Sequence, residues 1–372
     1  MAARPSGVPI VDLSHFHESA HAASPADRAS AAASLDAAAT DVGFFYVSIP
    51  GLAEAGDRLL ARCREVHALP QAEKDSVMSS KSTHHRGFSQ TWKSGQGSCA
   101  MRPGEGPPDP KEAFVLGSEG EDLSPMHGPN QWPSEEVLPG WRDAVQEDRD
   151  VFLGAARAIA RAMATALADR GTASASEDVF AEAMREPPAS IVMLRYDPAW
   201  RSASGTSRVA CGAHTDCGFF TLLVQEPGAA PLQVQRGMIN AGVRDRAGAA
   251  VVDEDAWVDA PPLSGHILVN VGDLLSRWTN GKWRSTVHRV MLGSGSNGAR
   301  HSVAFFANAT YAAWVECLPS CCAPAPGMPP PQFEPITAGR YMSDRLGLMY
   351  DAQAAGDSVS ESESARECEC ER

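Results

Sequence analysis

A succession of short apolar runs in the second half of the chain most constrains its fold. From residue 190 onward, stretches rich in β-branched and aromatic residues alternate with turn residues: SIVMLRYDP (190–198), GFFTLLVQE (218–226), PLQVQRG (231–237), WVDAPP (257–262), HILVNVGD (266–273), STVHRVML (285–292) and RHSVAFFAN (300–308). Strands this short and this closely spaced are typical of a β-sandwich or a closed barrel. Units of the βαβ type would instead place long helical patterns between the strands.

The first half of the chain carries the helical patterns. Ser24 is a good N-cap for an alanine-rich helix that starts at Pro25 and runs to about Thr40. The other expected elements are strands over 8–14 and 42–51, helices over about 54–68 and 141–169, the last ended by Gly171, and a long loop with short strands over about 80–121. The chain is therefore predicted to be mainly β with flanking α.

Charge and cysteine usage restrict the partners and the compartment. Asp and Glu outnumber Lys and Arg by 46 to 32, so the formal net charge is -14, which argues against binding to nucleic acid or to an anionic membrane surface. No apolar run reaches the length of a transmembrane helix, and the N-terminus lacks a secretory pattern. The 9 cysteines are scattered rather than arranged as a disulfide framework. A cytoplasmic protein is expected.

Two polar residues stand at the head of a strand-like stretch, VACGAHTDCGFFTLLVQE (209–226). If His214 and Asp216 lie in a strand, they share one face and can present an imidazole beside a carboxylate. An isolated His-x-Asp is more often an ordinary hydrogen-bonded pair. His288, in another alternating run, adds a third group, and two histidines with one carboxylate fit one face of an octahedral ferrous ion. Zinc is the alternative, because the same side chains suit it.

A fourth group lies twelve residues beyond His288. Arg300 and Ser302 are two apart in RHSVAFFAN and would share a strand face. A planar guanidinium beside a hydroxyl is suited to holding a carboxylate end-on in a desolvated place. An exposed salt bridge is the commoner role of a single arginine, but its position after the three candidate ligands favours a carboxylate site.

The motifs HTD (214–216), HRV (288–290) and RHS (300–302) together resemble the H-x-D … H … R-x-S signature of the Fe(II)/2-oxoglutarate-dependent dioxygenases, in the isopenicillin-N-synthase-like branch. The resemblance covers about Val8 to Tyr350. Further segments that resemble this family are VPIVDLS, VGFFYVSIPG, ALPQAEKDSV, RGFSQ with DPKEAFVLG, HILVNVGDLLSRWTNGKWRSTVHRV and EPITAGRYMSDRL.

The resemblance implies a double-stranded β-helix, or jelly-roll, core behind an N-terminal helical region. It implies an N-terminal region over 1-185, an Fe(II)/2-oxoglutarate jelly-roll core over 186-312 and a C-terminal lid over 313-352. Residues 353-372 are acidic and serine-rich and are expected to form a disordered tail. A monomer that acts on a small-molecule substrate is expected.

The resemblance also implies roles for single residues. His214, Asp216 and His288 would bind Fe(II), while Arg300, Ser302 and Tyr196 would hold the distal carboxylate of 2-oxoglutarate. Many relatives have Asn where this chain has Leu194, so part of that polar support is either absent or supplied from elsewhere. The implied reaction consumes O₂, converts 2-oxoglutarate to succinate and CO₂, and hydroxylates, desaturates or cyclises a small organic molecule.

Two other functions remain open at this point. An oxidase of the same fold, similar to isopenicillin N synthase, would use iron and O₂ without 2-oxoglutarate, and it too could keep the Arg300 and Ser302 pair. A relative that only binds a small ligand would have lost turnover. The complete set of candidate ligands argues against this last possibility.

Several neighbouring residues are expected to have ordinary roles. Cys217 should point away from the metal and pack, and Asn270 and Asp273 fit a turn and a helix cap. The glycine-rich segment 293–298 is expected to be a hairpin loop rather than a dinucleotide site, because it opens no helix. His84, His85 and Arg86 could contact an acidic substrate or form a solvated basic cluster.

Overall fold

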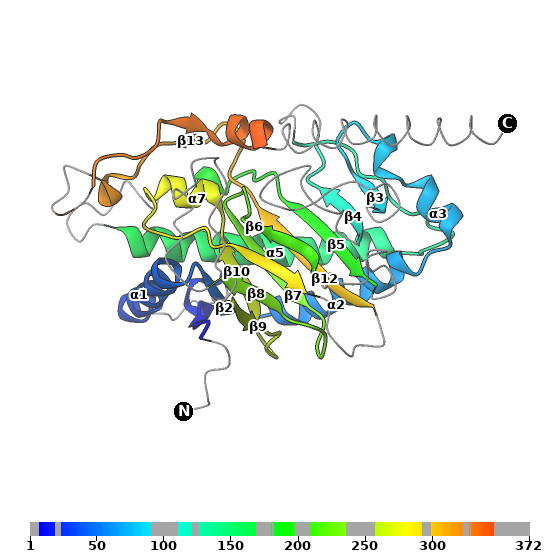
Figure 1. Cartoon of the computed structure of the whole chain (residues 1–372), viewed down its shortest axis with the longest axis horizontal. Helices are drawn as coiled ribbons and strands as arrows, with labels where there is room; N and C mark the ends of the chain where they lie inside the picture. The colour runs from blue at the N-terminus through cyan, green and yellow to red at the C-terminus, as the bar shows by residue number, and fades with distance from the viewer. Residues whose placement is uncertain are drawn as a thin grey trace, which may run out of the picture.

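The protein is described by a computed structural model in which the described residues form two large β-sheets, a two-stranded sheet and a set of helices (Figure 1). The structure describes residues 7–18, 24–90, 111–120, 126–168, 180, 182–197, 209–235, 257–291, 299–322, 327 and 329–345. Gly171, the glycine-rich segment 293–298 and the acidic tail 353-372 lie outside these residues.

The larger sheet has eight strands in the order β1-β2-β10-β7-β12-β5-β4-β3. Its neighbouring strands are antiparallel except for β1 and β2, which are parallel. In this order the strands span Ile10–Asp12, Phe44–Ser48, Ile267–Val271, Phe220–Gln225, Arg300–Ala307, Ser190–Tyr196, Glu112–Gly117 and Gly87–Gln90.

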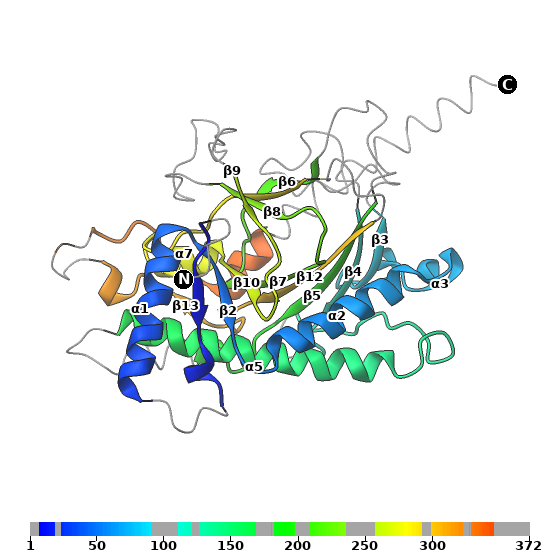
Figure 2. The same ribbon diagram turned by 90° about the horizontal axis from the view of Figure 1, so that it is seen from below.

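The smaller sheet has four strands in the order β6-β11-β8-β9, which span Val209–His214, His288–Met291, Leu232–Gln235 and Trp257–Ala260. Figure 2 shows the two sheets facing each other, with α2 and α5 beneath the larger one. A small core of apolar residues, including Tyr46, Tyr196 and Val234, fills the space between the sheets. The expected jelly-roll core is confirmed.

Helices α2 and α5 cover the outer face of the larger sheet (Figure 2). The longest is α5 (Trp141–Leu167), whose buried side chains, Phe152 and Ile159 among them, join one core with Phe305 and Leu222 of the sheet. The other helices are α1 (Pro25–Asp41), α2 (Leu52–His67), α3 (Gln71–Ser76), α7 (Asp273–Trp278) and a helix over residues 338–345, which follows the short strands β13 (Trp314–Val315) and β14 (Ile336–Thr337).

The start of α1 follows from local chemistry. The Ser24 hydroxyl accepts a hydrogen bond from the backbone N–H of Asp27, and the Asp27 carboxylate accepts one from the backbone N–H of Ser24. This reciprocal capping box and Pro25 in the first turn fix the first turn where the sequence predicts it. Among the described residues, no helix combines the length and the apolarity needed to cross a membrane.

Two expectations about strand organisation are wrong. The stretch 209–226 is not one strand, because β6 ends at His214 and belongs to the smaller sheet whereas β7 starts at Phe220 in the larger one. β11 and β12 do not pair with each other as the strands of a hairpin, because they lie in different sheets. Periodicity within one run does not reveal which sheet a strand joins, since the side chains alternate in the same way in both.

Candidate active site

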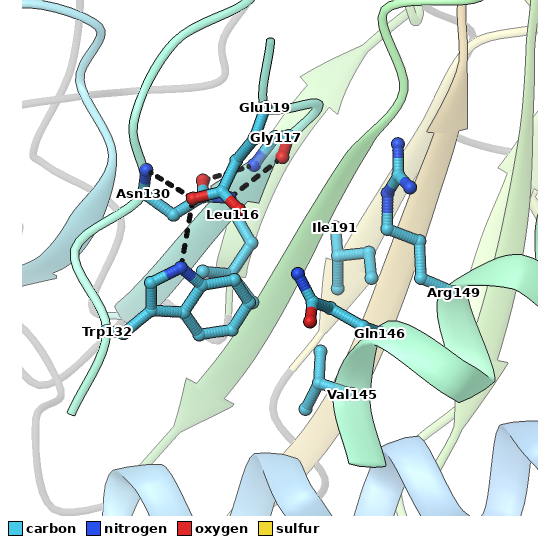
Figure 3. A pocket seen from close by; sticks show the side chains of 9 residues that line it. All are labelled: Leu116, Gly117, Glu119, Asn130, Trp132, Val145, Gln146, Arg149 and Ile191. Carbon is cyan, nitrogen blue, oxygen red and sulfur yellow. Dashed lines mark hydrogen bonds between the residues drawn. The ribbon is translucent and has the colours of Figure 1, made fainter. Parts of the chain in front are cut away.

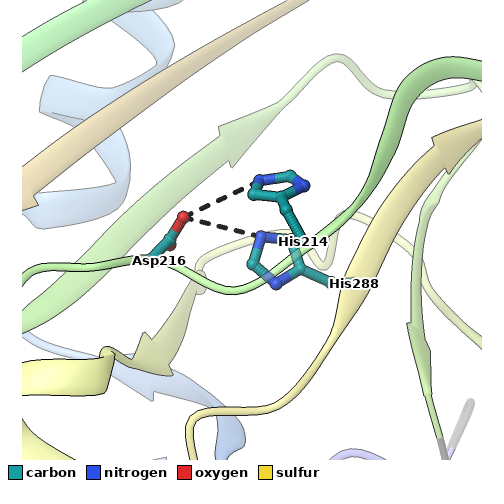
Figure 4. Close-up of side chains that lie close together, drawn as sticks. All are labelled: His214, Asp216 and His288. Atoms are coloured by element: carbon teal, nitrogen blue, oxygen red, sulfur yellow. Dashed lines mark ion pairs between the residues drawn. The ribbon is translucent and has the colours of Figure 1, made fainter. Parts of the chain in front are cut away.

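Three candidate ligands converge between the two sheets (Figure 4). His214 is the last residue of β6 and His288 the first of β11, and the antiparallel pairing of these strands places the two residues opposite each other. The Nε2 atoms of His214 and His288 lie 3.8 Å and 3.7 Å from Oδ1 of Asp216. One ligand atom from each of the three residues lies within 4.8 Å of the other two.

Asp216 reaches this cluster by a route that the sequence did not indicate. It lies in the turn after β6 and not in a strand, so alternation along a strand does not explain its position. The turn is held from behind by the start of α7, where the backbone N–H of Asp273 donates to the Asp216 carbonyl at 2.7 Å and that of Leu274 donates to the Gly218 carbonyl at 3.1 Å.

Hydrogen bonds from Nδ1 orient the two imidazole rings so that each Nε2 atom faces the other candidate ligands. Nδ1 of His214 donates to the Gly212 carbonyl at 2.8 Å and Nδ1 of His288 donates to the Thr286 carbonyl at 3.1 Å, since a carbonyl oxygen can only accept. Each Nε2 atom therefore keeps its lone pair for a ligand, because the proton of a neutral imidazole sits on the other nitrogen.

The carboxylate of Asp216 is oriented in the same way. Its Oδ2 atom accepts hydrogen bonds from the Thr221 hydroxyl at 2.6 Å and from Nδ2 of Asn270 at 2.7 Å, which leaves Oδ1 facing the two imidazoles. Asn270 is in the middle of β10, so the expectation that it serves a turn is wrong. Its contact joins β10 to the turn after β6, which is 54 residues away in the chain, and no local pattern contains that information.

The electrostatics of the cluster suit a divalent cation. Burial alone would raise the pKa of Asp216, but the two imidazoles and the hydrogen bonds from Thr221 and Asn270 bring it below its usual value. Burial, with the neighbouring His214 ring, lowers the pKa of His288 to about 4. At neutral pH His288 is thus uncharged and Asp216 is ionised. Two imidazole nitrogens and one carboxylate oxygen form a donor set that fits Fe(II).

A buried guanidinium lies on the same inner face of the larger sheet. Arg300 is 5% exposed, and its guanidinium donates to the Ser302 hydroxyl, the Ala230 carbonyl and Oε1 of Gln225 at 3.2, 3.0 and 3.4 Å. It lies 5.2 Å from the centre of the Tyr196 ring. Burial lowers its pKa from the ordinary value, and no carboxylate of the described residues forms an ion pair with it. A buried guanidinium of this kind is suited to binding an anion.

The Arg300 guanidinium is held by β7 and by the segment after it, through Gln225 and the Ala230 carbonyl. Leu194 lies opposite Ser302 in the register of β5 and β12, and Gln225 lies opposite Ser302 on the other side. The Gln225 amide also donates to the Ala260 carbonyl and accepts from the backbone N–H of Leu232. We did not identify Gln225 from the sequence, although a polar residue at an inward position of the apolar run LLVQ is a usable signal.

A separate cavity of about 230 Å³ lies on the outer face of the larger sheet, between β4, β5 and α5 (Figure 3). Its polar groups largely satisfy one another, since Glu119 accepts hydrogen bonds from Trp132, Arg142 and the backbone of Asn130. The lining residues are Leu116, Gly117, Glu119, Asn130, Trp132, Val145, Gln146, Arg149 and Ile191. None of the candidate ligands contributes to it.

Comparisons with known proteins identify the family that this chain resembles in sequence. The model of the non-haem dioxygenase in morphine synthesis N-terminal family matches residues 8–135, and that of the 2OG-Fe(II) oxygenase superfamily matches residues 188–309. Homoarginine-6-hydroxylase of Arabidopsis thaliana is 30% identical over 79% of this chain and 81% of its own. A 2-oxoglutarate-dependent dioxygenase of Aspergillus niger is 26% identical over 80% of this chain and 83% of its own.

The fold has a solved counterpart. A full-length Neurospora crassa protein in complex with alpha-KG superposes with a TM-score of 0.69 at 24% identity and covers 91% of this chain and 96% of its own. At this identity the superposition supports the fold.

Proposed function

This chain belongs to the 2OG-Fe(II) oxygenase superfamily, and we propose that His214, Asp216 and His288 hold its ferrous ion. The observation that carries the assignment is the orientation of the three side chains. Each has its second polar atom occupied by a hydrogen bond, and each presents its remaining donor atom to a common point. Surrounding groups that fix ligands in this way are a usual feature of metal sites.

We further propose that Arg300, Ser302 and Tyr196 hold the distal carboxylate of 2-oxoglutarate. Arg300 can offer a bidentate contact in a desolvated place, and the Ser302 hydroxyl lies 3.2 Å from its Nη1 atom. Ferrous iron with 2-oxoglutarate and O₂ supplies oxidative decarboxylation to succinate and CO₂, coupled to oxidation of a small organic molecule. The chain contributes orientation of the cosubstrate and exclusion of water.

The register of the larger sheet supports a proposal for the position of the substrate. Asn270, Thr221, Phe306, Ser190 and Gly117 are successive partners across β10, β7, β12, β5 and β4, so they form one row on the inner face. Asp216 contacts the first two, at the metal end of the row.

The other end of this row is polar and positively charged. The guanidinium of Arg86 occupies the space left by the absent side chain of Gly117, and it contacts the Ser190 hydroxyl. Phe306 lies between the two ends and is only half-buried. We propose that the substrate packs on Phe306 with its reactive carbon toward the metal ligands and a polar group toward Arg86.

The decisive experiment is anaerobic addition of 2-oxoglutarate to the Fe(II)-loaded protein, followed by visible absorption. A metal-to-ligand charge-transfer band is expected for the wild type and not for His214→Ala. A substrate panel scored by succinate release, with His214→Ala as the blank, then identifies the reaction. A wild-type protein that binds Fe(II) without developing the band would favour the oxidase alternative instead.

We also retain three expectations as proposals. The divisions at 185, 312 and 352 separate an N-terminal region, the core and a C-terminal lid, although β1 to β4 complete the sheet of the core. The protein acts as a monomer. It works in the cytoplasm, a proposal that the free thiols of the described cysteines support.

A further inference from the structure

Asp273 contacts the segments that carry all three candidate ligands. It is the first residue of α7, and its side chain is buried. Its carboxylate accepts hydrogen bonds from Ser285, three residues before His288, at 2.5 Å and from Thr215, between His214 and Asp216, at 3.2 Å. Its own backbone N–H donates to the Asp216 carbonyl. One side chain therefore links both strands of the metal cluster.

The same carboxylate is the anchor for the C-terminal helix. Nη2 of Arg345, from the helix over residues 338–345, lies 3.4 Å from Oδ2 of Asp273, the oxygen that also accepts from Thr215. The start of this helix is held at a different place, where the backbone N–H groups of Ala338 and Gly339 donate to the carbonyls of Ala313 and Tyr311. Arg345 thus connects the far end of the helix to the metal cluster.

The packing under the turn leaves little freedom for independent movement. A side chain at Gly272 would overlap the Gly218 carbonyl, and a side chain at Gly218 would overlap the Asn308 amide oxygen. The turn 215–218 is thus pressed between α7 and the end of β12. Because close-packed elements shift together, a displacement of Asp273 must move the turn that carries Asp216.

We infer that Asp273 is a positioning residue that couples docking of the helix over residues 338–345 to organisation of the metal cluster. This inference rests on the proposed metal site. When the helix is docked, Arg345 holds the Asp273 carboxylate where it orients Thr215 and Ser285, and the three ligands are in place. By thermodynamic reciprocity, a metal ion in the cluster must also strengthen the docking of the helix by the same factor.

The first test is Mn(II) affinity, measured by electron paramagnetic resonance, in Arg345→Met and in its matched control Arg340→Met. Arg340 is on the same helix, but its side chain is 76% exposed and, among the described residues, forms an ion pair only with Asp344. We expect Arg345→Met to weaken Mn(II) binding by about fivefold or more, and Arg340→Met to leave it unchanged. Equal affinities in Arg345→Met and the wild type would overturn the coupling.

The second test measures the reverse effect by hydrogen exchange of residues 338–345. Saturating Mn(II) should slow exchange of these amides in the wild type, by the factor that Arg345→Met loses in affinity. In Arg345→Met the exchange should be fast with or without Mn(II). If Mn(II) protects the helix equally in both proteins, Arg345 does not transmit the effect.

A double-mutant cycle distinguishes a specific coupling between Asp273 and Arg345 from a general loss of stability. Asp273→Asn should weaken Mn(II) binding at least as much as Arg345→Met, and the double variant should add no further loss beyond Asp273→Asn. Additive losses would contradict a shared route. The His214→Ala variant separates failure of the proposed metal site from failure of the proposed coupling. If the wild type binds Mn(II) no better than His214→Ala, the metal site itself is refuted.

Discussion

The two faces of the larger sheet use the same strands for opposite purposes. On β12, Val303 and Phe305 point outward into the fully buried core against α2 and α5, whereas Arg300 and Ser302 point inward. At these positions of β12 the outward side chains are apolar, and the inward ones are a guanidinium and a hydroxyl that are hydrogen-bonded to each other. Alternate residues of a strand face opposite sides of the sheet. On β12, residues that stabilise the core are therefore direct neighbours in sequence of residues that face the candidate active site.

The strongest test of this division is removal of an inner ligand. His288→Ala should lower turnover by about 1,000-fold or more, because the three ligands act as one unit. The measurement is succinate release under saturating Fe(II), alongside the free energy of unfolding by urea. A variant that keeps a tenth of the wild-type turnover would show that His288 is not a ligand.

The opposite change on the outer face should affect stability alone. Phe305 is fully buried and packs against Phe152 at a ring distance of 5.4 Å. Phe305→Ala should lower the free energy of unfolding by about 3–5 kcal/mol, because it leaves a cavity in the core. Per folded molecule, Mn(II) affinity should stay near that of the wild type. A large loss of metal affinity would mean that the two faces are not separable.

Arg300→Met tests the inner face at some distance from the metal. Loss of the guanidinium should weaken 2-oxoglutarate binding by about 2–5 kcal/mol, since the cosubstrate carboxylate would be buried without its partner. The KM for 2-oxoglutarate reports the effect, and Mn(II) affinity serves as the control because Arg300 contacts no candidate ligand. An unchanged KM would contradict the carboxylate site.

Thr221→Val tests how much the hydrogen bonds to Oδ2 of Asp216 contribute to metal affinity. The substitution keeps the shape and removes the donor to Oδ2, while the Asn270 donor remains. Metal affinity should fall by about 10- to 100-fold, as is usual for groups that orient a ligand. Thr279→Val, a buried threonine in the turn that ends α7, is the matched control for loss of a hydroxyl and should leave metal affinity unchanged.

The stability of the metal-free protein is expected to depend on pH and to change by only a small amount at each step of pH. Burial lowers the pKa of His288 to about 4 from the ordinary 6.5, so between these values the unfolded chain binds a proton that the folded chain does not. Stability should therefore fall as the pH drops from about 6.5 towards 4, by at most about 1.4 kcal/mol per pH unit from this group. Urea unfolding in the presence of a chelator, with His288→Ala as reference, isolates its share. Identical pH profiles would contradict the shift.

How far the sequence predicts this molecule depends on whether a feature is local. The capping box of α1 and the apolar face of α5 involve neighbours in the chain, and both helices begin where expected. The strands from 190 onward are likewise found close to the predicted runs. Their assignment to two sheets, with β6 and β7 on opposite sides, depends on pairing between distant segments, which local patterns do not encode.

The candidate active site also contains contacts that local sequence patterns cannot predict. His214, Asp216, His288 and Arg300 were identified by residue type and order, and the structure brings the first three together. Asn270 and Asp273 were given local roles because a turn and a helix start are what their neighbours suggest. Their principal contacts are with Asp216 and with residues 215, 285 and 345, and these contacts exist only once the chain has folded.

The hydrogen bonds that hold the two imidazoles have a consequence for how the site tolerates change. Each Nδ1 atom is fixed by a main-chain carbonyl two residues earlier on the same segment, Gly212 for one ring and Thr286 for the other. Main-chain oxygens are present whatever residue occupies those positions. Substitutions around the two histidines can therefore alter the cavity walls, and with them the molecules that the cavity admits, while the orientation of both imidazole rings is preserved.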